Sequence, residues 1–141
     1  MPEGPAKAGL IDTSVVIELD RIDAAALPAE MAVSAITLAE LAAGPHATND
    51  LTERARRQER LQRTEATFDP IPFDIECARA YGRVYTETLT AGRKARGPRA
   101  IDLLIAATAL ANDLPLYTTN PTDFAGLTGL ITVAPLVASV P

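Results

Sequence analysis

The stretch Ala8-Gly-Leu-Ile-Asp-Thr-Ser14 decides the fold. Its first four residues form a short apolar run, and the hydroxyls of the Asp12-Thr13-Ser14 segment can cap a helix that follows at once. We therefore expect a strand over residues 8–11 and a helix to about Leu19, with Asp12 at the carboxyl end of the strand. A short buried strand that leads into a helix is typical of a parallel sheet covered by helices.

The rest of the chain repeats this alternation of apolar strands and helices. Further strands are predicted over residues 31–33, 116–118 and 130–133, with a short extended piece over residues 71–73. Helices are predicted from Ser34 or Thr37 to Gly44, and over residues 51–66, 74–90 and 99–112. The predicted fold class is α/β, a small, mainly parallel twisted sheet with helices on both faces. Because the chain has no internal repeat or linker, residues 1–141 are predicted to form a single domain.

The last predicted helix has a core stripe formed by Ile101, Leu104, Ile105 and Thr108. These residues follow the i, i+3, i+4, i+7 spacing, and Asp102 lies about 100° away from them around the helix. The carboxylate of Asp102 is therefore expected at the edge of the sheet and outside the core.

Composition limits where the protein works. The only cysteine, Cys77, excludes an intramolecular disulfide, and residues 1–9 lack the apolar core of a signal peptide. No apolar stretch reaches the length of a membrane span, so a cytoplasmic protein without membrane contact is expected. The net charge is −5, yet nine of the 13 basic residues lie within residues 54–63 and 93–99, so two local basic surfaces remain available to nucleic acid.

Four acidic residues lie in or beside apolar runs, namely Asp12, Glu40, Asp102 and Asp123. An unpaired carboxylate in apolar surroundings costs several kcal/mol, so these residues require a common partner. Two carboxylates about 5 Å apart repel by roughly 3 kcal/mol at an effective dielectric near 20, and a divalent cation removes that cost. Oxygen ligands with little histidine favour Mg²⁺ or Mn²⁺.

Each acid also has a purely structural explanation. Thr37-x-x-Glu40 matches a capping box, and Asn120-x-x-Asp123 matches turn chemistry. Asp12 and Asp102 lie near predicted helix starts, where a carboxylate stabilises the helix dipole. These alternatives stay open for each residue taken singly.

Four segments in order make the chain resemble the PIN-domain ribonucleases, and among them the VapC toxins of bacterial toxin-antitoxin pairs. The segments are Leu10-Ile-Asp-Thr-Ser14, Ser34-Ala-Ile-Thr-Leu-Ala-Glu-Leu-Ala-Ala-Gly44, Ala100-Ile-Asp-Leu-Leu-Ile-Ala-Ala107 and Leu116-Tyr-Thr-Thr-Asn-Pro-Thr-Asp-Phe124. The resemblance covers nearly the whole chain and implies a PIN-like fold.

The resemblance also implies an activity, a site and partners. It implies an RNA endonuclease with Asp12, Glu40, Asp102 and Asp123 as catalytic, metal-binding acids for Mg²⁺ or Mn²⁺. The implied supporting polar groups are Thr13, Ser14, Thr118 and Asn120. The implied partners are an RNA substrate, a VapB-type antitoxin and a second copy of the chain in a homodimer.

The basic loop Arg93, Lys94, Arg96 and Arg99 leads directly into Asp102, so it is predicted to bind RNA phosphates. The arginine-rich segment 54–63 carries interleaved glutamates, which favours a solvated helix or a partner surface. The alternative function is a non-catalytic PIN-like module that binds RNA or protein. A phosphoacceptor receiver domain is disfavoured because neither late strand carries the lysine that it needs.

Overall fold

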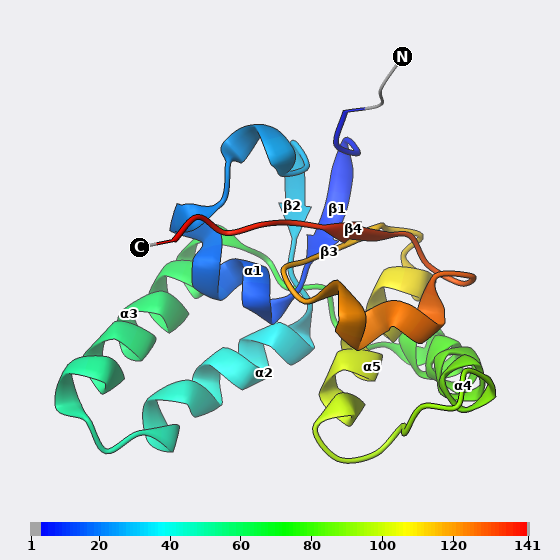
Figure 1. Ribbon diagram of the computed structural model, residues 1–141. Helices are drawn as coiled ribbons and strands as arrows, with labels where there is room; N and C mark the ends of the chain where they lie inside the picture. The colour runs from blue at the N-terminus through cyan, green and yellow to red at the C-terminus, as the bar shows by residue number, and fades with distance from the viewer. Residues whose placement is uncertain (1–3, 141) are drawn as a thin grey trace.

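The computed structural model describes residues 4–140, which surround a sheet of four parallel strands (Figure 1). The strands are β1 (Ala8–Ile11), β2 (Glu30–Ala32), β3 (Leu116–Thr118) and β4 (Val133–Pro135), in the order β2-β1-β3-β4. Residues 1–3 and 141 of the predicted single domain lie outside the described residues. The predicted fold class is confirmed.

The strand register directs alternate side chains to the two faces of the sheet. Leu10 pairs with Leu116, and both belong to one buried cluster. Ile11 pairs with Tyr117, and both belong to a second cluster. Because successive residues of a strand point to opposite faces, the two clusters lie on opposite sides of the sheet.

Five α-helices flank this sheet. Their bounds are α1 (Thr13–Glu18), α2 (Ala35–Ala43), α3 (Leu51–Thr67), α4 (Ile75–Thr90) and α5 (Arg99–Ala111). Short 3-10 helices complete the chain, with bounds η1 (Leu19–Arg21), η2 (Ala24–Ala26), η3 (Gly44–Ala47) and η4 (Pro121–Leu127). Within residues 4–140, no helix combines the length and the apolar character needed to cross a membrane.

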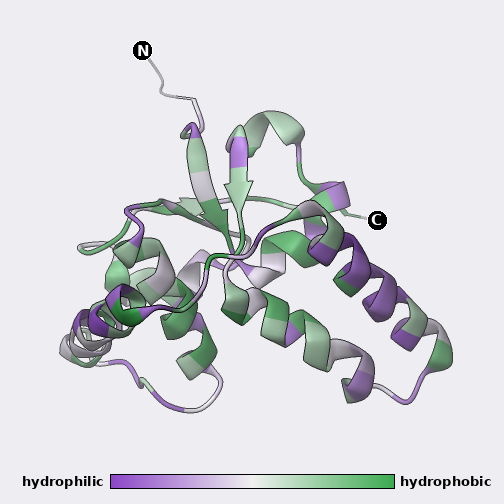
Figure 2. Cartoon of the chain, turned by 180° about the vertical axis from the view of Figure 1, so that it is seen from behind, coloured by the Kyte–Doolittle hydropathy of each residue, from purple (hydrophilic) through white to green (hydrophobic). Residues whose placement is uncertain are grey.

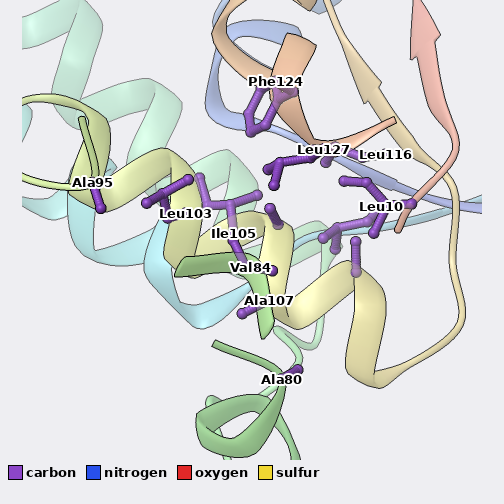
Figure 3. Packing of buried hydrophobic residues seen from close by; sticks show 13 residues of the cluster. Leu10, Ala80, Val84, Ala95, Leu103, Ile105, Ala107, Leu116, Phe124 and Leu127 are labelled. Carbon is purple, nitrogen blue, oxygen red and sulfur yellow. The ribbon is translucent and has the colours of Figure 1, made fainter. Parts of the chain in front are cut away.

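The larger buried cluster joins α4, α5 and η4 to the sheet. Figure 3 shows Leu103 and Ile105 of α5, Val84 of α4, Phe124 and Leu127 of η4 and Leu10 of β1 among the side chains of this cluster. The second cluster places α1 and one side of α3 on the opposite face. The remainder of α3 is hydrophilic along its length, as Figure 2 shows, which fits the solvated helix expected for segment 54–63.

The core stripe predicted for α5 is wrong at its first position. Ile101 is 37% exposed, whereas Leu103 is 1% exposed. The helix packs against α4, α2 and η4, so its buried surface is wider than a single stripe and includes Ala106 and Ala107. Ile105 and Thr108 are buried as predicted.

The last predicted strand is also displaced along the chain. Leu130 and Ile131 donate backbone hydrogen bonds to the carbonyl of Leu127, at 2.9 and 3.0 Å, and thereby continue the turn that ends η4. The backbone joins the sheet only at Val133. The second strand is likewise shifted, from the predicted 31–33 to Glu30–Ala32.

Candidate active site

Asp12 lies at the carboxyl end of β1, where the strand order changes direction. The chain passes from β1 to β2 on one side, and β3 pairs on the other. Ligands of parallel sheets bind at such a switch point. The Asp12 side chain is 5% exposed, and its backbone N–H donates to the Tyr117 carbonyl at 3.0 Å.

The carboxylate of Asp12 caps α1. Its Oδ1 accepts from the Val15 N–H at 3.2 Å and from the Ser14 hydroxyl. The sequence suggested that the hydroxyls of Thr13 and Ser14 would cap this helix, but the Asp12 carboxylate is the cap. The structural explanation of Asp12 as an acid that stabilises the start of a helix is therefore correct. Burial raises the pKa of Asp12, and hydrogen bonds from Ser14 and Thr118 oppose that shift.

Two of the predicted supporting hydroxyls tie the end of β3 to Asp12. The Ser14 hydroxyl oxygen accepts from the Thr119 N–H at 3.2 Å, while the same hydroxyl donates to Asp12. Thr118 is buried and accepts from the Asn120 N–H at 2.9 Å. Asn120 is exposed, and within residues 4–140 only its backbone atoms form hydrogen bonds. The structure thus places Ser14 and Thr118, but not the Asn120 amide, beside the acid.

Glu40 lies in the middle of α2 and is fixed by a residue of α1. Its Oε1 accepts from the Thr13 hydroxyl, whose oxygen lies 3.1 Å from the Thr37 hydroxyl oxygen. Ser34 is the N-cap, since its hydroxyl oxygen accepts from the Thr37 N–H at 3.0 Å. The capping-box explanation for Glu40 is therefore wrong. Burial raises the pKa of Glu40, the Thr13 bond lowers it, and the charge of Asp12 raises it.

Asp102 lies in the first turn of α5, where the negative charges of the other three predicted acids act on it. Burial, followed by the negative charges of Asp123, Glu40 and Asp12, raises the pKa of Asp102 to about 6, and the charge of Arg99 opposes the shift. Interactions between like charges of this kind require proximity. These four acids, here called the acidic edge, are thus close enough for the charges of the other three to act on Asp102.

The fourth acid, Asp123, lies in η4 and is anchored to α5. Arg99 donates through Nη1 to the backbone carbonyl of Asp123 at 2.9 Å. In the predicted RNA-binding loop, Lys94 and Arg96 are exposed, whereas Arg93 and Arg99 are half-buried. Arg99 therefore holds two parts of the site together.

Two features beside the acids were not predicted. Thr37 is fully buried and contacts Thr13, although it was considered only as a capping residue. A cavity of about 300 Å³ lies between α1, α2 and α3, and Glu40 and Thr13 line it together with Arg57 and Arg60. Arg57, Arg60 and Thr64 share the inward side of α3, but charged residues recur all along this helix, so its sequence does not mark that side.

Within residues 4–140, no three carboxylate, imidazole or thiol groups are arranged so that they could hold a metal ion without movement. Mg²⁺ is commonly bound through one or two carboxylates and several waters, so a closed protein cage is not needed. The donor set still fits this ion, because every candidate ligand is a carboxylate oxygen, and three negative charges but only one positive charge, that of Arg99, act on Asp102.

Comparison with known proteins identifies a family. The PIN domain family model matches residues 10–130. Ribonuclease VapC5 of Mycobacterium tuberculosis is 36% identical over 129 residues, which are 89% of this chain and 92% of that protein. Ribonuclease VapC1 of Rickettsia felis is 30% identical over 129 residues, covering 86% and 91% of the two chains.

A solved structure has the same fold. The crystal structure of VapBC-5 from Mycobacterium tuberculosis, a member of the VapBC family of toxin-antitoxin systems, matches with a TM-score of 0.78 and 36% identity. The match covers 90% of this chain and 95% of that one. The chain therefore belongs to the PIN-domain family and, within it, to the VapC group.

Proposed function

We propose that this protein is a ribonuclease toxin of a VapBC-type pair, which hydrolyses RNA phosphodiester bonds at an acidic site that uses Mg²⁺ or Mn²⁺. The proposal is carried by the contacts that link the four acids: Thr13, next to Asp12, binds Glu40, and Arg99 of α5 binds the carbonyl of Asp123. The charges of Asp123, Glu40 and Asp12 accordingly raise the pKa of Asp102. Family membership and the names of the VapC relatives support the RNA substrate.

Asp12 and Asp102 are the principal ligands of the ion in this proposal. Asp12 is fixed by the first turn of α1, and Asp102 projects from the first turn of α5. Glu40 and Asp123 complete the acidic edge and orient the ion or a water. When bound, such an ion stabilises the negative charge that develops on a phosphodiester attacked by water.

The surrounding hydroxyls prepare this edge for its ligand. The Thr13 hydroxyl holds one oxygen of Glu40, and the Ser14 hydroxyl holds Oδ1 of Asp12. These bonds limit the rotamers of both carboxylates before a ligand arrives, which reduces the ordering cost of binding. Burial raises the pKa values of Asp12, Glu40 and Asp102, so a bound cation would favour their charged forms.

The proposed partners follow from the relatives. A VapB-type antitoxin is expected, because VapBC-5 is a toxin-antitoxin system. A homodimer is expected as well, with the α4 face around Tyr81 and Tyr85, whose ring centroids lie 6.1 Å apart, as the candidate contact. The expected location is the cytoplasm. Light scattering on the isolated chain measures the oligomeric state, and a monomer at micromolar concentration contradicts the dimer.

Metal-dependent RNA cleavage tests the function directly. Purified protein is incubated with total RNA in Mg²⁺ or Mn²⁺, in EDTA, and in EDTA followed by excess metal. Cleavage should occur with metal, stop with EDTA and return on addition of metal. Asp12→Asn is the matched control, because its amide oxygen can still cap α1 while the charge is lost.

The same assay separates the alternative function. RNA binding without cleavage under every metal condition would indicate a non-catalytic binding module. Equal cleavage by the wild type and a pure Asp12→Asn protein would exclude the acidic site as the source of activity.

A further inference from the structure

The arginines of α3 differ in how the protein itself uses them. Arg57 pairs with Glu53 at 3.1 Å and donates to the Gly44 carbonyl at 2.9 Å. Arg56 pairs with the same glutamate at 3.8 Å. Two arginines of α3, Arg56 and Arg57, thus pair with the same carboxylate of Glu53.

The ends of the helix follow the same pattern. Arg54 donates to the carbonyls of Pro45 and Thr48, at 3.1 and 2.9 Å. Arg63 pairs with Glu59 at 3.0 Å and with Asp20 at 3.8 Å. Arg60 is different, since its guanidinium has neither an ion pair nor a hydrogen bond among residues 4–140.

Arg60 nevertheless faces inward, toward the acidic edge. It is half-buried and lines the cavity of about 300 Å³ that also contains Thr13 and Glu40. Ile17 and Arg60 also line a neighbouring cavity of about 280 Å³, so the two spaces adjoin along the seam between α1 and α3. A guanidinium without an ion pair among the described residues therefore lines a cavity beside the site, together with Glu53 and Arg57.

Arg60 does not serve as the counter-ion of Glu40. The two side chains line the same cavity, but no ion pair joins them among residues 4–140. The positive charge of Arg60 is consequently available to a ligand that enters the cavity. A guanidinium binds a phosphate through two parallel N–H donors, which makes it well suited to a phosphodiester.

We propose that Arg60 is a phosphate-binding residue that holds the RNA backbone on the Glu40 side of the cleavage site. The inference rests on the proposed function for its substrate. The acidic edge repels RNA, so the polymer needs cations beside it, and the loop with Lys94 and Arg96 provides them only on the α5 side. With Arg60 on the α3 side, the RNA backbone crosses the four carboxylates and is held at both ends.

The test measures RNA binding separately from cleavage. A short fluorescein-labelled single-stranded RNA is titrated with the Asp12→Asn protein, alone and combined with Arg60→Gln, Arg60→Lys or Arg56→Gln. Arg56→Gln is the matched control. It removes the same charge one helical turn from Arg60, and the Arg56 side chain is 70% exposed. Melting temperatures confirm that each variant is folded.

The expected result is a loss of one phosphate contact in Arg60→Gln alone. One contact on a single strand contributes about 0.7 to the slope of log affinity against log salt. Extrapolated from 1 M, where counterion release vanishes, this amounts to about an eightfold weaker affinity at about 50 mM salt. Arg60→Lys should retain most of the slope, and Arg56→Gln should retain all of it.

Several outcomes overturn the proposal. Equal salt slopes for Arg60→Gln and Arg56→Gln would show that the weaker RNA binding of Arg60→Gln comes from the change in net charge and not from a lost phosphate contact. Unchanged RNA binding by Arg60→Gln, together with lost binding of a hexaglutamate peptide, would assign Arg60 to a protein contact. Wild-type protein that binds RNA through Arg60 but never cleaves it would contradict the proposed nuclease function, while the phosphate-binding role of Arg60 would stand. Failure of the proposed function and failure of the Arg60 proposal are therefore distinguishable.

Discussion

The hydroxyl of Thr13 donates a hydrogen bond to Oε1 of Glu40 and so joins the first turn of α1 to the middle of α2. Because Thr13 directly follows Asp12, this one bond fixes the position of Glu40 relative to the strand end that carries Asp12. The two acids are far apart in the sequence, and their spacing depends on a side chain that is not itself acidic.

Thr13→Val should lower RNA cleavage without unfolding the protein. Valine keeps the shape of the side chain but removes the donor, and a hydrogen bond to a charged group is worth about 1.5–3 kcal/mol, which corresponds to roughly 10- to 100-fold in kcat/KM. Thr13→Ser retains the hydroxyl and should retain most of the activity. Equal rates for the valine variant and the wild type would show that the bond does not position Glu40 for the reaction.

Asp102 should destabilise the fold as the pH rises. Its pKa in the folded protein is raised to about 6, from an ordinary value of 3.8, so the folded state binds more protons than the unfolded chain between about pH 4 and pH 6. The contribution of Asp102 to stability is therefore fully present below about pH 4 and is lost as the pH rises through about 6. Urea denaturation at several pH values measures this loss.

Asp102→Asn should remove that pH dependence and raise the free energy of unfolding at neutral pH. After allowance for solvent screening of a half-buried group, the gain is about 1–2 kcal/mol. Mg²⁺ should stabilise the wild type but not the variant, since it binds the folded state through this carboxylate. A variant that is as pH-dependent as the wild type, or that is stabilised equally by Mg²⁺, would contradict this role.

Local sequence patterns were sufficient for most of the fold. The apolar run at residues 8–11, the helix that ends at Gly44 and the helix that begins after Asp74 are all found where they were predicted. The error at the last strand arose because Leu130 and Ile131 are apolar for a different reason. They close the turn after η4 and fill the core, and a run of apolar residues does not distinguish that role from a strand.

The sequence identified which residues belong to the candidate site, but it did not identify most of the contacts between them. The position of Asp12 follows from the strand-to-helix junction. The bond between Thr13 and Glu40 depends on how α1 and α2 pack, and the capping-box motif indicated a different partner for Glu40. The inward position of Arg60 likewise depends on the α1–α3 seam, because charges alternate all along α3.

Gly9→Ala should destabilise the protein through a specific collision. A Cβ at residue 9 would lie 2.5 Å from Cε1 of Tyr117 and 3.1 Å from Cγ of Pro28. The Tyr117 hydroxyl also accepts from the Ala6 N–H at 2.8 Å, so the ring cannot move away freely. Overpacking of this kind costs about 1–3 kcal/mol, which denaturant unfolding measures.

Gly82→Ala is the matched control for the strand glycine. A Cβ at residue 82 meets no heavy atom within 4 Å, and the residue lies on the exposed side of α4. Alanine at an exposed helix position should stabilise the protein by about 0.5–1 kcal/mol. A loss of stability of the same size at both positions would show that the Tyr117 contact does not limit residue 9.

Arg99→Gln should move the acid limb of the pH–rate profile to higher pH. Arg99 lowers the pKa of Asp102 by its charge and holds the Asp123 carbonyl at 2.9 Å. Without that charge, Asp102 stays protonated to a higher pH, and the protonated acid cannot bind a cation. The matched variant Arg96→Gln removes the same charge from an exposed position in the same loop, so it should weaken RNA binding and raise KM without displacing the profile. Measuring kcat and KM across pH for both variants separates the two roles. An equal displacement of the pH–rate profile in both variants would mean that Arg99 acts through net charge alone. A change confined to KM would make Arg99 an RNA contact and exclude it as the residue that lowers the pKa of Asp102.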